Sequence, residues 1–114
     1  MLAINTADTA MLTRPAIGEN QIAFVYAGNL WVADLNGKNP RQLTVEAEVA
    51  SLPVFSPDGR WLAFSAQRNG NVDVYLIPAE GGLSKRLTWH PGADIVQDFT
   101  PDGKSLLFTS TSKA

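Results

Sequence analysis

The stretch FSPDGRWLAF at residues 55–64 returns as FTPDGKSLLF at residues 99–108, 44 positions further along the chain. A second match keeps the same spacing, because RQLT at residues 41–44 returns as KRLT at residues 85–88. A degenerate earlier copy is AIGENQIAF at residues 16–24. Its IAF aligns with LAF at residues 62–64, but it lacks Pro-Asp-Gly. A period of ~40–45 residues in a strand-rich chain is typical of the blades of a β-propeller.

Each unit is expected to fold as four short β-strands, because turn signals divide it at regular intervals. In Ser56-Pro57-Asp58-Gly59, proline presets φ, aspartate can accept hydrogen bonds from its own turn, and glycine adopts the left-handed conformation of a bulged hairpin. Asn69-Gly70 is the strongest short hairpin signal of the second unit, and the first unit has the shorter Ala27-Gly28-Asn29 at that place. A third turn is expected at residues 79–82, with residues 34–37 as its counterpart.

Strand alternation indicates a sheet that is covered on both faces. Leu62 and Phe64 should point to one face, and Trp61 and Ala63 to the other, so that both faces carry apolar side chains. Stacked blades cover a sheet in this way. The small side chains of Ala23 and Ala63 would let neighbouring blades approach closely.

The repeats predict the organisation of the whole chain. Residues 1–13 form a lead-in, residues 14–52 the first blade, residues 53–96 the second, and residues 97–114 the start of a third. The predicted fold is therefore all-β, with two complete blades of four antiparallel strands and the first hairpin of a third. A ring of four blades needs ~160 residues, so we expect an incomplete propeller. Its open strand edges and apolar blade faces predict an oligomer, or a requirement for the rest of a parent chain.

The composition excludes several classes of function. The net charge of −2 and the pI near 5.2 provide no basic surface for nucleic acid. The absence of cysteine excludes disulfides, thiol catalysis and cysteine-ligated zinc. No run approaches the ~18 apolar residues of a membrane span, and residues 1–12 lack the charged and apolar regions of a signal peptide. The location stays open between cytoplasmic and, if a parent carries a cleaved signal peptide, periplasmic.

The motif Ser/Thr-Pro-Asp-Gly occurs twice, and each copy is followed by a basic residue and a strand with Leu-x-Phe. These units resemble the WD-repeat-like propeller units of TolB, the dipeptidyl-peptidase group and the tricorn-type serine peptidases. Three runs are similar to the opening blades of a tricorn-type propeller: TRPAIGENQIAFVYAGNLWVADLNG at residues 13–37, NVDVYLIPAEGGLSKRLTWHPGAD at 71–94 and DFTPDGKSLLFTS at 98–110. The resemblance covers residues 13–112. The first unit departs from it, so Gly18-Glu19-Asn20 is expected to turn in place of Pro-Asp-Gly.

The resemblance implies a function without catalysis in this chain. Tricorn-type enzymes carry their nucleophilic serine and its partners on a separate region after the propellers, and nothing in this sequence matches that region. The chain is then expected to serve substrate passage, gating or assembly in a tricorn-like serine peptidase, with peptides or a protein as partners. Two alternatives stay open: a TolB-like protein-interaction propeller, and a fragment in which two or three copies complete a ring.

Residues that could carry chemistry each have a structural interpretation that we favour. His90 with Asp94 could suggest a triad, but no serine lies in a Gly-x-Ser-x-Gly elbow, so a histidine in a connecting loop is preferred. Asp58 and Asp102 occupy equivalent places in successive repeats, which indicates turn formation and not paired acid–base catalysis. Asp94 and Asp98 with His90 match no calcium or zinc pattern.

The remaining candidates are also assigned to structure. Gly103-Lys104-Ser105 imitates the end of a phosphate-binding loop, but Asp98 stands where that loop needs a glycine. Trp31 and Trp61 are expected to pack between blades, whereas Trp89, beside the loop, could equally bind a ligand. We therefore expect no catalytic, cofactor-binding or metal-binding residue, and no cofactor.

Overall fold

The computed structural model describes residues 15–89 and 92–111, and within these ranges it contains β-strands and no helix. The strands are β1 (Ala16–Ile17), β2 (Gln21–Tyr26), β3 (Asn29–Asp34), β4 (Arg41–Gln42), β5 (Val54–Phe55), β6 (Trp61–Arg68), β7 (Asn71–Pro78), β8 (Lys85–Arg86), β9 (Asp94–Phe99) and β10 (Leu106–Ser110). No helix in the described part of the chain is therefore long and apolar enough to cross a membrane.

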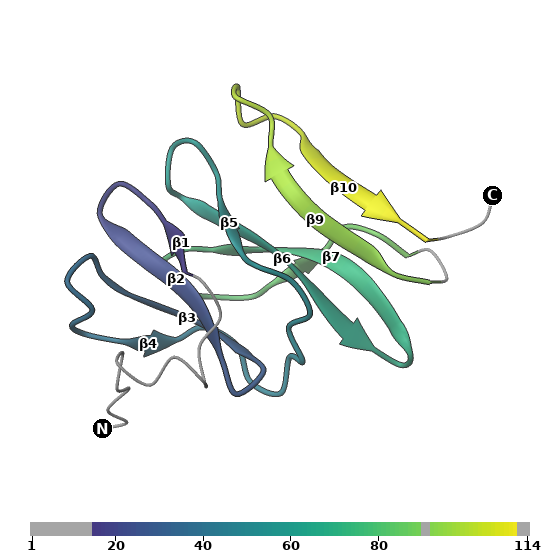
Figure 1. The fold of residues 1–114 in the computed structure, drawn as a ribbon, viewed down its shortest axis with the longest axis horizontal. Helices are drawn as coiled ribbons and strands as arrows, with labels where there is room; N and C mark the ends of the chain where they lie inside the picture. The colour runs from purple at the N-terminus through teal and green to yellow at the C-terminus, as the bar shows by residue number, and fades with distance from the viewer. Residues whose placement is uncertain (1–14, 90–91, 112–114) are drawn as a thin grey trace.

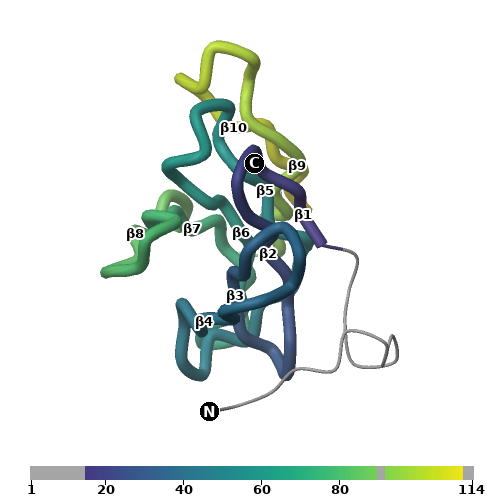
Figure 2. The backbone as a smooth tube through the Cα atoms, turned by 90° about the vertical axis from the view of Figure 1, so that its left-hand side faces the viewer, coloured from purple at the N-terminus to yellow at the C-terminus, as the bar shows by residue number. Residues whose placement is uncertain are grey.

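The strands form three antiparallel sheets that follow one another along the chain. Blade 1 has the order β1-β2-β3-β4, blade 2 has the order β5-β6-β7-β8, and the start of blade 3 is the pair β9-β10. The sheets lie face to face like the leaves of a fan (Figure 1). Figure 2 shows the outer strands β4 and β8 on one side of the molecule and the first strands β1, β5 and β9 towards the other. The predicted open, all-β arrangement of propeller blades is confirmed.

The repeated Pro-Asp-Gly segments form the same turn in blades 2 and 3. Gly59 and Gly103 have φ values of 74° and 73°, in the left-handed region that favours glycine. Their amide groups donate to the carbonyl oxygens of Ser56 at 2.9 Å and Thr100 at 2.8 Å. Local sequence alone therefore specifies how these two hairpins close.

The first blade turns differently at this place, as its missing Pro-Asp-Gly predicted. The amide of Gly18 donates to the carbonyl oxygen of Gln21 at 2.8 Å, which closes the turn. A Cβ atom at Gly18 would lie 3.2 Å from the ring of Phe55 in blade 2. The close approach of the neighbouring blade therefore leaves little room for a larger residue here.

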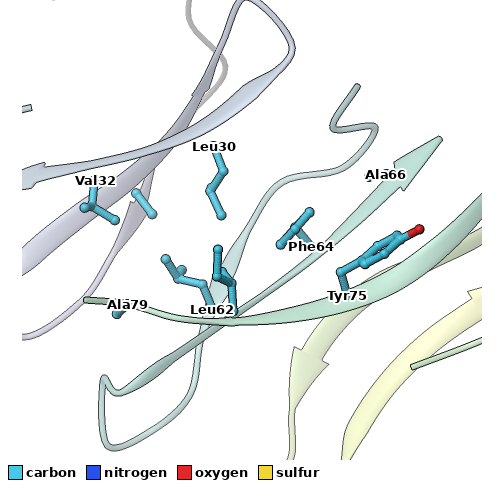
Figure 3. Packing of buried hydrophobic residues seen from close by; sticks show 9 residues of the cluster. Leu30, Val32, Leu62, Phe64, Ala66, Tyr75 and Ala79 are labelled. Atoms are coloured by element: carbon cyan, nitrogen blue, oxygen red, sulfur yellow. The ribbon is translucent and has the colours of Figure 1, made fainter. Parts of the chain in front are cut away.

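The largest apolar cluster lies between blades 1 and 2. Figure 3 shows Leu30 and Val32 of β3 facing Leu62 and Phe64 of β6, and all four side chains are buried. Each such side chain contributes roughly 1.5–3 kcal/mol when it leaves water. Ala23, which is fully buried in the same cluster, allows the close approach that the sequence predicted. These side chains attach the two sheets to each other.

The second interface, between blades 2 and 3, uses the opposite face of β6. Ala63 and Val74 pack there against Val96 of β9. The pairing of β9 with β10 shifts between Leu107 and Phe108, so no residue of β10 stands opposite Gln97 in the strand register. This bulge places Val96 and Phe99 on the same face of the sheet, where both contact the cluster.

The described strands begin at Ala16 in blade 1, at Val54 in blade 2 and at Asp94 in blade 3. The boundary expected after residue 96 therefore falls within β9, whereas the one expected after residue 52 precedes β5. The division into units at residues 14, 53 and 97 stays a prediction.

Candidate functional site

A shallow groove of about 470 Å³ runs along the first strands of the three blades. β5 contacts both β1 and β9, so the inner edges of the blades meet here, on the side that faces the central channel in a closed propeller. Nine residues line the groove: Pro15, Ala16, Ser51, Leu52, Pro53, Val54, Ile95, Val96 and Gln97.

The groove carries no ionisable side chain, and its polar groups are amides, hydroxyls and strand backbone. The hydroxyl of Ser51 accepts a hydrogen bond from the amide of Ser65 at 2.9 Å and donates to the carbonyl oxygen of Leu52 at 3.2 Å. The amide of Gln97 lies 3.4 Å from the hydroxyl of Thr109. These groups can hydrogen-bond an extended, neutral backbone but do not provide the charge that phosphate or carboxylate ligands need.

The turn aspartates lie outside this groove, each within its own hairpin. Asp58 accepts hydrogen bonds from the hydroxyl of Ser56 at 2.6 Å and the amide of Arg60 at 3.0 Å. Asp102 accepts the equivalent bonds from Thr100 at 2.6 Å and Lys104 at 3.0 Å. Both hydrogen bonds hold the pKa of each carboxyl below its ordinary value. The bond from the hydroxyl group has the larger effect, and the bond from the backbone amide the next largest. Both aspartates therefore stabilise turns.

The acidic residues considered for a metal site are not brought together. Asp94 and Asp98 stand near opposite ends of β9, opposite Ser110 and Leu107, so about 13 Å of strand separates them. Asp94 is fully buried, whereas Asp98 is exposed and accepts from the amide of Phe99 at 2.8 Å. His90 lies outside the described residues. Among those described, no group of three histidine, cysteine or acidic residues could hold a metal ion.

The tryptophans differ from one another more than the sequence indicated. Trp31 is buried and stacks on Phe24 with ring centroids 6.5 Å apart. Trp61, in contrast, is 40% exposed, so the expectation that it packs between blades is wrong. It is the first residue of β6, where β6 pairs with Pro78 of β7 but extends past β5. Trp89 is 66% exposed and lies under the guanidinium of Arg86 at 5.7 Å.

The Gly103-Lys104-Ser105 segment belongs to the turn between β9 and β10. The amide of Ser105 donates to the hydroxyl of Thr100 at 3.2 Å, which ties the segment into the hairpin. No helix begins there, so its amides do not form the anion site of a phosphate-binding loop.

A buried polar cluster in blade 2 was missed by sequence reasoning. The carboxylate of Asp73 is fully buried and accepts hydrogen bonds from Arg86 at 2.5 Å and from the hydroxyl of Thr88 at 3.0 Å. The same hydroxyl accepts from the amide of Val74 at 3.0 Å, so the cluster joins β7 to the segment after β8. The signal was present, because an Asn or Asp stands fifteen positions before the Thr of both Leu-Thr segments.

Comparison with known proteins shows which families have similar sequences and folds. Residues 9–114 match the model of the tricorn protease N-terminal beta propeller domain. The putative tricorn protease homolog 2 of Streptomyces coelicolor is 38% identical over 84 residues, which are 73% of this chain and 7% of that protein. The Tol-Pal system protein TolB of Desulfosudis oleivorans is 29% identical over 91 residues, which are 68% of this chain and 21% of that protein. The chain thus spans less than a quarter of the length of these relatives.

Solved structures show the same two relationships. The crystal structure of the tricorn protease matches this chain with a TM-score of 0.74 and 29% identity. The match covers 86% of this chain and 10% of that protein. The crystal structure of TolB from Acinetobacter baumannii matches 87% of this chain with a TM-score of 0.75 and 30% identity, over 26% of that protein. With its repeated hairpins, its stacked four-stranded blades and a family match that covers residues 9–114, the chain belongs to the family of tricorn protease N-terminal β-propeller domains.

Proposed function

We propose that this chain is the substrate-guiding part of a tricorn-like serine peptidase, and that extended peptides lie along the groove formed by β1, β5 and β9. The observation that carries the proposal is the uncharged lining of that groove, in which three strand edges meet. An unfolded peptide needs backbone partners and tolerates apolar walls, and such a groove discriminates little between side chains. Bond cleavage is assigned to another region of the parent protein.

The groove is tested by filling it. Gln97 is exposed in the groove, and Gln67 is also exposed, on β6 outside it. A Gln97→Trp variant should weaken binding of a fluorescein-labelled, uncharged, unstructured peptide about tenfold, measured by fluorescence anisotropy. The Gln67→Trp variant makes the same change elsewhere and should bind as the original chain does. Equal affinity in both variants, or no binding by the folded chain, would contradict the proposal.

The assignment of catalysis to another region is tested separately. The purified chain, incubated with peptide substrates, should release no product when the digest is followed by mass spectrometry. Genuine turnover that disappears in a His90→Ala variant would overturn this part of the proposal. A peptide-binding result without turnover supports both parts.

A TolB-like interaction propeller is the second candidate, because TolB structures match the fold as well as the tricorn protease does. In that case the blades would bind a folded protein partner and no peptidase would follow. The sequence of the parent beyond residue 114 separates the two candidates. A PDZ-like segment and a late serine region favour the peptidase, and an end after about four further blades favours the TolB-like protein.

A further inference from the structure

One serine hydroxyl joins blade 2 to the first strand of blade 3. The hydroxyl of Ser65, on β6, donates to the carbonyl oxygen of Asp94 at 2.8 Å and accepts from the amide of Val96 at 2.9 Å. Ser65 is fully buried between the two blades. Its side chain thus supplies both hydrogen bonds that these backbone groups of β9 need.

The counterparts of these two β9 residues in blade 2 are Val49 and Ser51. Val49 stands opposite Ala66 of β6, as Asp94 stands opposite Ser110 of β10, and Ala66 and Ser110 are 44 positions apart. Ser51 follows Val49 by two positions and is therefore the second counterpart. The same two backbone groups are thus present at the junction of blades 1 and 2.

These backbone groups of blade 2 point away from β6. The amide of Ala50 donates to the carbonyl oxygen of Ser65 at 2.7 Å, so the carbonyl oxygen of Val49 and the amide of Ser51 point the other way. Neither group has a hydrogen-bond partner among the residues that the structure describes. The hydroxyl of Ser51 is engaged elsewhere, with the amide of Ser65 and the carbonyl oxygen of Leu52.

Blade 1 has a valine where blade 2 has the joining serine. Val25 pairs with Leu30, and Ser65 pairs with the residue 44 positions after Leu30, so the two positions are equivalent. Valine has no hydroxyl to offer. A cleft of about 350 Å³ lies here, lined by Val25, Val49, Ala50, Ser51 and Leu52. Ser51 and Leu52 also line the groove along β1, β5 and β9, so the cleft adjoins that groove.

We propose that this cleft is a subsite for an aliphatic hydroxyl group, supplied by a serine side chain of a peptide that lies in the groove. The hydroxyl would donate to the carbonyl oxygen of Val49 and accept from the amide of Ser51, as the hydroxyl of Ser65 does at the next junction. The methylene group of the ligand would contact Val25 and Leu52. The peptide part of this inference rests on the groove proposed above.

The subsite is tested first without the groove, with the full chain labelled with ¹⁵N and a capped amino acid. N-acetylserine N-methylamide, at millimolar concentration, should shift the NMR signal of the Ser51 amide and slow its hydrogen exchange. The capped alanine compound lacks the hydroxyl and should do neither. Equal effects of the two compounds, or no effect of the serine compound, would mean that the groups are only hydrated and would overturn the proposal.

The second measurement places the hydroxyl on a peptide. Two fluorescein-labelled, uncharged peptides that differ only in a central serine or alanine are compared by fluorescence anisotropy. The serine peptide should bind about tenfold more tightly, because two hydrogen bonds are gained in a site open to water. Equal binding of the two would refute the subsite and leave the groove proposal intact. If neither peptide binds but the capped serine still shifts Ser51, the groove proposal fails and the subsite stands.

Two variants at Val25 separate the hydroxyl from the change in volume. Val25→Ser gives blade 1 its own hydroxyl, which should protect the Ser51 amide in the free chain and abolish the preference for the serine peptide. Val25→Ala removes apolar volume without adding a hydroxyl and should keep the preference. A preference that survives Val25→Ser, or that is lost equally in Val25→Ala, would contradict the proposal. The comparison of the two peptides on the original chain needs neither variant, and it decides the matter if the variants do not fold.

Discussion

Blade 1 closes its outer corner with neutral side chains, whereas blade 2 closes the same corner with a buried ion pair. In blade 1 the oxygen of Asn29 accepts from the hydroxyl of Thr44 at 3.0 Å and from the amide of Ala47 at 3.1 Å. In blade 2 the corresponding position, 44 residues later, is Asp73 with Thr88, and Arg86 supplies the other hydrogen bond. One backbone geometry is thus stabilised by two kinds of chemistry.

The difference follows from the donors that each blade has available. The residue 44 positions after Ala47 is Pro91, which has no amide hydrogen to donate. Gln42 of blade 1 is replaced by Arg86, which donates to the carboxylate and also, at 2.9 Å, to the carbonyl oxygen of Thr88. A fully buried carboxylate needs such partners, because leaving it unpaired costs several kcal/mol. Blade 2 therefore needs its arginine to pair a carboxylate, whereas Gln42 of blade 1 donates to the carbonyl oxygen of Thr44, at 2.6 Å, and to no buried charge.

The largest expected difference between the blades comes from removing that arginine. Breaking a buried pair costs about 3–5 kcal/mol, and because the side chain of Arg86 is 33% exposed, we expect about 2–3 kcal/mol for Arg86→Ala. Gln42→Ala should cost less than about 1 kcal/mol, because Gln42 is exposed. Urea denaturation measures both free energies of unfolding.

The double variant Asp73→Asn with Arg86→Gln gives blade 2 the chemistry of blade 1. It should lie within about 1 kcal/mol of the original chain, because no buried charge remains at this corner. If it is as unstable as Arg86→Ala alone, charge burial is not the reason for the difference between the blades.

The threonines at this corner should show the next largest difference. Thr88→Val removes a hydrogen bond to a charged carboxylate, worth about 1.5–3 kcal/mol, and Thr44→Val removes a bond to a neutral amide, worth about 0.5–1.5 kcal/mol. Thr88→Val also removes the acceptor for the backbone amide of Val74, and Thr44→Val removes the acceptor for that of Leu30. Because both variants lose this second hydrogen bond, it does not contribute to the difference between them. Unfolding free energies that are equal in the two variants would indicate that the charge of Asp73 adds nothing to its hydrogen bond.

A smaller difference is expected at the turns that join the second and third strands. Ala27 and Asn69 both have φ of 51°, in the left-handed region, where asparagine is favoured over alanine. Ala27→Asn should therefore stabilise the chain by about 0.5–1 kcal/mol, and Asn69→Ala should destabilise it by a similar amount. Thermal unfolding followed by circular dichroism gives the sign, and changes in the same direction would contradict the argument.

The smallest expected difference between blades 1 and 2 is in how the first turn of each contributes to the pH dependence of stability. The pKa of Asp58 is held below the ordinary value of 3.8, so ionisation of this group favours the folded state. Its contribution is present above pH 3.8 and is lost as the pH falls through the lower, folded pKa. Blade 1 has no aspartate in its turn.

We therefore expect Asp58→Asn to flatten the acid limb of the stability curve slightly, relative to the original chain. Unfolding in urea at a series of acidic pH values measures the two curves. The exposed Glu19→Gln change in the turn of blade 1 serves as the control. Equal flattening by both variants would show that the effect is not specific to the aspartate turn.

Much of the fold could be predicted from the sequence because its signals are local. The Pro-Asp-Gly turns, the Asn69-Gly70 hairpin and the repeat spacing each depend on a few neighbouring residues, and the structure has a turn at each of these places. The irregular turn at Gly18 was also predicted. The contact that limits the space at Gly18, with the ring of Phe55 in the next blade, was not, because the two residues are distant in sequence.

The features that sequence reasoning missed depend on which blade covers which surface. Trp61 has a large apolar side chain, as core residues do, but it is the first residue of β6 and remains partly exposed. Asp73 has a charged side chain, as surface residues do, but it is fully buried on the face of β7 that carries Tyr75, and so it requires Arg86. The groove along β1, β5 and β9 likewise exists only once three blades are placed side by side.

Local sequence patterns were enough to predict the repeat, the four-strand unit, the positions of the hairpins and the family, since turn chemistry and strand alternation act between residues that are close along the chain. Which carboxylates are buried, which tryptophans are exposed and which strand edges line a groove follow only from the tertiary structure. Burial depends on the residues of a neighbouring blade, about forty positions away, and no local pattern records how closely two blades approach.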